Sequence, residues 1–114
     1  MSIPSEIVSL IERLTHELDR IEQETREGLN LAQELLSRFT NNAILTQYFA
    51  YFSTIRFFVE TSKQQVNTIT DTLSAEDVPF EVIQEAGEDL GMLLGQVLEV
   101  KINVSRTKTS LDNW

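Results

Sequence analysis

Few residues in this chain have the types and spacing that catalysis or metal binding requires. His16 is the single histidine, and the sequence contains no cysteine. A dinuclear carboxylate centre in a helical bundle needs two Glu-x-x-His pairs, which one histidine does not supply. His16 has Glu12 and Arg20 at four-residue spacing on either side, which is typical of a solvent-exposed helix face with ion pairing. We therefore predict no metal and no cofactor at His16.

Nucleophilic catalysis has equally little support. Serine and threonine are plentiful, but a hydroxyl nucleophile needs a base beside it, and a single histidine offers none that is obvious. The sequence has no GxSxG, GxGxxG or phosphate-loop motif. The acidic residues at 76–77 and 85–89 lack the central glycine of a calcium loop and suit the start of a helix, where the helix dipole favours negative charge. We expect that the protein is not an enzyme.

The most specific pattern is a GxxxGxxxG run formed by Gly87, Gly91 and Gly95. Each glycine inside a helix costs about 1 kcal/mol relative to alanine, so some compensating interaction is expected. At four-residue spacing these glycines form a smooth ridge beside Leu94 and Leu98, on which another helix can approach closely. We predict helix–helix packing on this ridge, within the chain or between two chains. A hinge, and a ligand lying against bare backbone, are the alternatives.

A second candidate surface is aromatic. Six aromatic residues lie close together in the sequence: Tyr48, Phe49, Tyr51, Phe52, Phe57 and Phe58. Most of them fall on the apolar side of the helix expected there and are predicted to form core. A pocket for an apolar ligand and a partner interface are the alternatives. Phe57 falls on the opposite side, near Ala50 and Thr54, and a large aromatic residue among small ones is a typical anchor for a facing helix.

The spacing of apolar residues predicts three long helices that would hold these surfaces. They are expected at about 3–39, 42–73 and 79–109, with an asparagine cap at Thr40–Asn42 and Pro79 in the first turn of the third helix. In each, apolar residues alternate spacings of three and four, which is the pattern of a coiled-coil seam. The predicted fold is all-α. It is an antiparallel, up-down-up bundle that forms a single domain over residues 1–114, with dimerisation as a way to complete it.

The first two seams fit each other when the chain folds back at Thr40–Asn42. Pairing residues whose numbers add to 83 or 84 places Ala32 against Phe52 and Gly28 against Ile55. Small side chains then lie opposite large ones, as close packing requires. We expect this register in the antiparallel pair.

Charge is distributed unevenly along the chain, whose formal net charge is -9. Residues 1–41 carry four basic and eight acidic side chains, residues 42–74 two of each, and residues 75–114 three basic and eight acidic. A middle helix with few charges is expected to be buried on more than one side. The acidic outer helices argue against nucleic acid and against an anionic membrane as partners, because both repel negative charge.

The two ends of the chain give weaker signals. The first residues have charges every few positions, so we expect no secretory signal. The apolar stretch at 43–59 is interrupted by polar residues and is shorter than the roughly 20 residues of a membrane span. With no cysteine, a cytoplasmic location is expected. The polar C-terminal segment is predicted to fray, or else Leu111 and Trp114 fold back over the first turn or dock on a partner.

The expected function is a non-catalytic helical interaction or oligomerisation module that binds a partner helix. The partner is a second copy, most simply in a homodimer, or another protein. The predicted interaction residues are Ala50, Thr54, Phe57, Gly87, Gly91, Gly95, Leu98 and Trp114. Two alternatives stay open: an apolar small-molecule binding protein, and an acidic decoy that blocks a basic nucleic-acid-binding protein.

Overall fold

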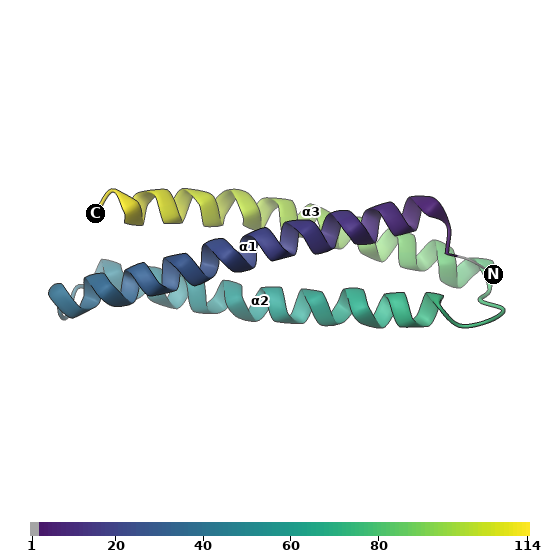
Figure 1. The fold of residues 1–114 in the computed structure, drawn as a ribbon, viewed down its shortest axis with the longest axis horizontal. Coiled ribbons are helices and arrows are strands. Elements are labelled where there is room, and N and C mark those ends of the chain that lie inside the picture. The colour runs from purple at the N-terminus through teal and green to yellow at the C-terminus, as the bar shows by residue number, and fades with distance from the viewer. Residues whose placement is uncertain (1–2) are drawn as a thin grey trace.

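Three long helices run up, down and up along one common axis (Figure 1). The computed structural model describes residues 3–114, and the helices are α1 (Ser5–Arg38), α2 (Ala43–Leu73) and α3 (Phe80–Asp112). The molecule is 58 Å long and at most 18 Å across. The predicted all-α antiparallel bundle is confirmed. Its helices begin and end close to the predicted positions, although α3 continues beyond residue 109 to Asp112.

The turns are built by residues that cap the following helix. Asn41 has a φ of 65°, in the left-handed region, and Asn42 then caps α2. The Asn42 side-chain oxygen accepts the backbone N–H groups of the residues two and three positions further on, at 3.0 and 3.1 Å. The predicted asparagine cap is therefore confirmed. In the second turn Asp77 is left-handed, with a φ of 56°, and Pro79 directly precedes α3.

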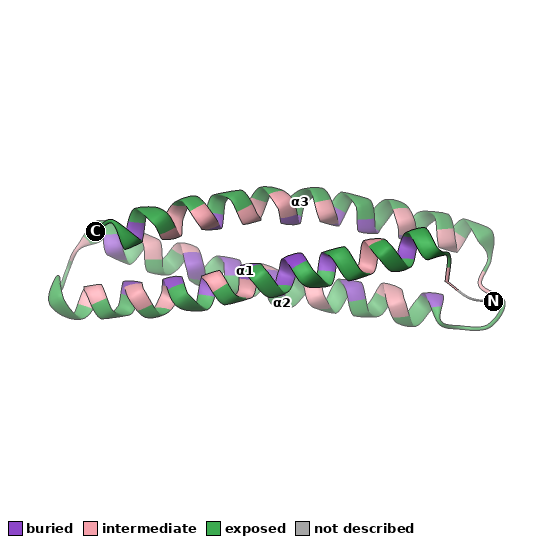
Figure 2. Ribbon diagram, turned by 45° about the horizontal axis from the view of Figure 1, so that its top comes forward, coloured by how far each residue is buried: buried purple, intermediate pink, exposed green. Residues whose placement is uncertain are grey.

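The core consists of the three predicted seams. Every seam residue is buried or half-buried except Phe39, which ends the first seam and is 48% exposed. Figure 2 shows the buried residues as an inward-facing stripe along each helix. Periodic burial of apolar side chains, at about 25 cal/mol for each Å² removed from water, therefore supplies the main force that holds the helices together.

The central helix is α1, not α2. It packs extensively on both other helices, whereas α2 and α3 contact each other much less. The expectation that the weakly charged α2 is buried on more than one side is therefore wrong. Its outer face is open to solvent, with Ile44 52% and Phe57 70% exposed. Among residues 3–114 no helix has the length and apolarity that crossing a membrane requires.

One detail of the predicted α1–α2 register is also wrong. The ring of Phe52 lies directly over Gly28, where a Cβ atom would be only 2.5 Å from the ring Cζ. The sequence pairing placed Ile55 there and put Phe52 one helical turn away, at Ala32. The size compensation itself holds, because the glycine makes room for Phe52, which is fully buried.

Ion pairs fix α1 against both neighbours. Lys101 of α3 lies 2.8 Å from the buried carboxylate of Glu17, and this hydrogen bond lowers the pKa of Glu17. On the other side, Lys63 of α2 lies 2.9 Å from Asp19 and 3.3 Å from Glu22. The hydrogen bond that the Lys63 ammonium donates to Asp19 is the main cause that raises the pKa of Lys63. Each pair holds its helix at a defined height along α1.

Candidate interaction site

The outer face of α2 presents Phe57 among small residues, as the sequence predicts. Phe57 is 70% exposed, and Ala50 and Thr54 are exposed on the preceding turns. The hydroxyl of Thr54 donates to the Ala50 carbonyl at 3.0 Å, and that of Ser53 donates to the Phe49 carbonyl at 2.9 Å. Because these hydroxyls are already satisfied inside the helix, a partner can cover them without leaving a polar group unpaired.

This face carries almost no charge. The sequence has no charged residue between Arg38 and Arg56, a stretch that includes the first turns of α2. Arg56 is then followed by Glu60, whose carboxylate lies 3.6 Å from its guanidinium, with both side chains exposed. The two charges cancel, so the outer face of α2 is electrically neutral on a protein of net charge -9.

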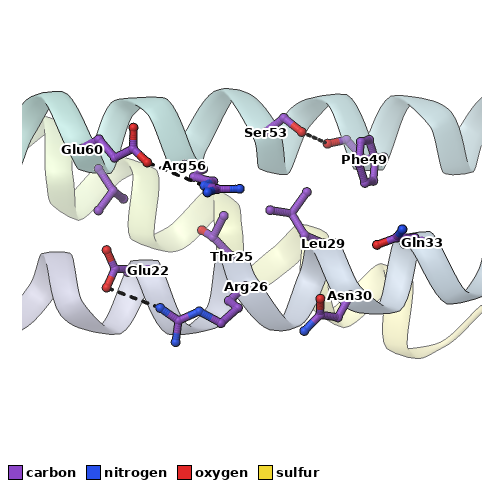
Figure 3. Close-up of a pocket in the computed structure, with 11 residues that line it drawn as sticks. Glu22, Thr25, Arg26, Leu29, Asn30, Gln33, Phe49, Ser53, Arg56 and Glu60 are labelled. Carbon is purple, nitrogen blue, oxygen red and sulfur yellow. Dashed lines mark hydrogen bonds and ion pairs between the residues drawn. The ribbon is translucent and has the colours of Figure 1, made fainter.

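A groove runs beside the Phe57 face, between α1 and α2 (Figure 3). Its volume is about 420 Å³, and its apolar lining comes from Leu29, Phe49 and Val59. Arg26 of α1 and Arg56 of α2 line opposite walls, and each pairs with a glutamate of its own helix, at 3.7 and 3.6 Å. Lys63 of α2 pairs with Glu22 at 3.3 Å, and among the described residues neither arginine pairs with the opposite wall. We call this feature the α1–α2 groove.

Thr25 lies at the floor of the α1–α2 groove. It is only 2% exposed, and its hydroxyl has no hydrogen-bond partner among the described residues. A buried hydroxyl without a partner costs about 1–3 kcal/mol. The packing of α1 against α2 under the groove therefore buries a hydroxyl without a partner among the described residues.

The glycine run lies along α3, largely open to solvent. A Cβ atom at Gly87 would be 3.8 Å from the side chain of Ile7, so this glycine approaches α1. At Gly91 and Gly95 a Cβ would have no described neighbour within 4 Å outside their own stretch of helix. Close packing within the chain is therefore not found at these two glycines. Packing between two chains stays a prediction, and Leu98 beside them is half-buried.

The structure separates the glycine run from Phe57. Ser105 lies four turns after Gly91 on the same side of α3, and its hydroxyl bonds to Glu24 of α1. The glycine side of α3 therefore borders α1, whereas Phe57 points away from the core. Trp114 contacts Tyr48 and so sets a common level for α2 and α3. Counted from that level at 1.5 Å per residue, Gly91 and Phe57 are about 20 Å apart along the bundle axis. The predicted interaction surface therefore consists of two separate parts, one on α2 and one on α3.

The C-terminal segment packs on its own chain. Leu111 is 1% exposed, and Trp114 makes an edge-to-face contact with Tyr48 at a ring separation of 6.3 Å. The predicted fraying is therefore not found, since α3 stays helical to Asp112 and the last residue contacts Tyr48 of α2. Trp114 remains 43% exposed, at the end of the bundle where α1 turns into α2 (Figure 1).

The α1–α2 groove is the feature that sequence reasoning missed. The seam pattern predicts which residues point inward, but it does not say which side of a helix pair the third helix covers. Ser53 and Arg56 fall outside the seam and have no distinguishing spacing, so nothing in the sequence singled them out. The uncharged stretch before Arg56 is the available signal, but on its own it indicates burial as readily as an interface.

Neither a metal site nor a similar known protein indicates a function for this surface. Between residues 3 and 114 there is no group of three or more side chains placed to hold a metal ion. No protein-family model matches the chain, and no curated protein or solved structure is significantly similar to it.

Proposed function

We propose that this protein is a non-catalytic interaction module that binds a partner helix on the outer face of α2. The observation that carries the proposal is the 70% exposure of Phe57 on a face that is electrically neutral. A single exposed aromatic residue is ordinary, but here Phe49 and the α1–α2 groove lie beside it. Exposed apolar surface on a face without net charge is typical of a protein interface.

Electrostatics restrict where a partner can approach. The chain segments of α1 and α3 carry the acidic excess, while α2 carries two basic and two acidic residues. An acidic partner, and a second copy above all, is repelled by α1 and α3 and not by α2. Self-association through α2 is therefore the simplest use of this face.

Affinity capture from the native cell tests the proposal with matched variants. We expect Phe57→Ser to abolish capture of the bound protein, whether a second copy or another chain. Phe80→Ser is the control, because Phe80 is 71% exposed at the start of α3, outside the proposed face. Equal capture by all three proteins would contradict the proposal. Capture that is insensitive to Phe57→Ser and is lost at modest salt would support the acidic decoy instead.

A second candidate function is binding of a small apolar molecule in the α1–α2 groove. Its volume of about 420 Å³ lies in the range of ligand sites. Titration with the fluorescent apolar probe ANS tests it. Binding that Ser53→Trp abolishes by filling the groove, while the mass of the assembly is unchanged, would favour this function over helix docking.

A further inference from the structure

We infer that the partner is a second copy of this chain, and that Phe57 of each copy docks over the α1–α2 groove of the other. The inference rests on the proposed function and adds the occupant of the face and its register. It follows from three features: the position of the groove beside Phe57, the reciprocal charges of α2, and the neutral character of this one side of an acidic protein.

The protruding ring and the groove lie next to each other on one side of the molecule. Ser53 and Glu60 line the groove, and they stand four residues before and three residues after Phe57, so they are its neighbours on the helix surface. Each copy therefore presents an apolar projection beside a recess that is partly apolar and has polar walls. Such a surface is complementary to itself when two copies meet about a two-fold axis.

The charges of α2 fix the register. When two α2 helices lie antiparallel with the axis at the level of Phe58, Arg56 of one copy faces Glu60 of the other, and the reverse pair forms by symmetry. Phe57 then lies at the level of Val59, whose buried side chain forms part of the groove floor. The Arg56–Glu60 contact within the helix is long, at 3.6 Å, and exposed, so exchanging it for a contact between copies costs little.

Charge also favours the groove side over the other sides of the protein for contact between two copies. Each chain has a net charge of -9, so two copies repel each other across most of their surface. The groove side contributes equal numbers of charges of each sign, from Arg26, Arg56, Glu22 and Glu60. Two copies can therefore approach on this side without the repulsion that the rest of α1 and α3 imposes.

Sedimentation at micromolar concentration tests the assembly. We expect a dimer for the wild type and for Phe80→Ser, and a dissociation constant at least about 30-fold higher for Phe57→Ser, the effect of losing a hot-spot residue. A wild type with the mass of one chain would overturn the inference and leave the proposed function to the capture experiment. A dimer that is unaffected by Phe57→Ser would overturn it as well.

Charge reversal tests the register. Arg56→Glu places like charges opposite each other and should weaken the dimer about tenfold, whereas the double variant with Glu60→Arg should restore it. Arg38→Glu is the control, because Arg38 also pairs with a glutamate four residues earlier but lies outside the groove. A double variant as weak as the single one would overturn the proposed register.

Photo-crosslinking tests the docking position itself. The photoreactive aromatic p-benzoylphenylalanine at position 57, mixed with isotope-labelled wild type, should crosslink to residues 22–33 or 53–60 of the labelled copy. The same group at position 80 should not. Crosslinks to α3, in a dimer that Phe57→Ser dissociates, would overturn docking over the groove while the role of the α2 face stands.

Discussion

The two flanks of α1 differ in how their charges pair. Towards α3 the pairs run between helices, with Lys101 at 2.8 Å from the buried Glu17 and Lys108 at 3.3 Å from Glu27. Towards α2 the Lys63 ammonium also crosses, to Asp19 and Glu22, but the two arginines of the α1–α2 groove pair within their own helices, and the space between them stays open. Pairs that cross an interface close it, whereas pairs within a helix leave it available. The α3 flank is therefore structural and the groove flank is available to a partner.

The largest expected effect comes from removing one cation from each flank. The two losses in free energy of unfolding then compare the flanks directly. Lys101→Met leaves the carboxylate of Glu17 buried without its partner and should lower the free energy of unfolding by about 2 kcal/mol, reduced from the usual cost because Lys101 is one-third exposed. Arg56→Met removes an exposed charge and should change it by less than about 0.5 kcal/mol. Urea unfolding of the protein diluted until it is monomeric measures both.

Equal losses for Lys101→Met and Arg56→Met would show that the two flanks do not differ energetically. The mass of the assembly should respond in the opposite way: Arg56→Met should weaken the dimer, whereas Lys101→Met should leave it unchanged. Measuring both quantities on both variants keeps stability and docking apart.

The second prediction compares a closed and an open position for glycine. Gly28→Ala places a Cβ against the ring of Phe52 and should lower the free energy of unfolding by about 1–2 kcal/mol through overpacking. Gly91→Ala meets open space and should raise it by up to about 1 kcal/mol, because alanine favours the helix. Thermal unfolding with sedimentation measures both. A Gly91→Ala protein that loses stability together with its dimer would instead show that the glycine run packs between chains.

The difference between the two flanks also explains which features of the fold could be predicted from the sequence. Helix number, direction and core residues follow from spacing alone, because a stripe of apolar residues has to be buried whichever helix covers it. The choice of central helix does not follow, since it depends on which flank closes. The absence of charge in α2 was consistent with burial or with an interface, and only the exposure of Phe57 separates the two. Gly28 likewise indicated close packing without naming Phe52 as the ring above it.

The third prediction concerns the floor of the groove. Thr25→Val keeps the shape of the side chain and removes the hydroxyl that has no partner among residues 3–114, so it should raise the free energy of unfolding by about 1 kcal/mol. Thr70→Val is the control, because the Thr70 hydroxyl donates to the Val66 carbonyl at 2.8 Å and should not stabilise when removed. A loss of stability in Thr25→Val would show that its hydroxyl is satisfied in solution.

The fourth prediction is the smallest and uses pH to isolate the closed flank. The hydrogen bond from Lys101 lowers the pKa of Glu17 in the folded protein below its usual value of 4.5. The unfolded chain therefore binds a proton first as the pH falls, so this interaction stabilises the fold above that value and is lost as the pH falls through the folded pKa. The free energy of unfolding, measured from neutral to acid pH, should therefore fall less steeply with falling pH in Glu17→Gln than in the wild type. The same slope in Glu17→Gln as in the wild type would show that other carboxylates account for acid sensitivity, and that the ion pair contributes nothing specific to the contact between α1 and α3.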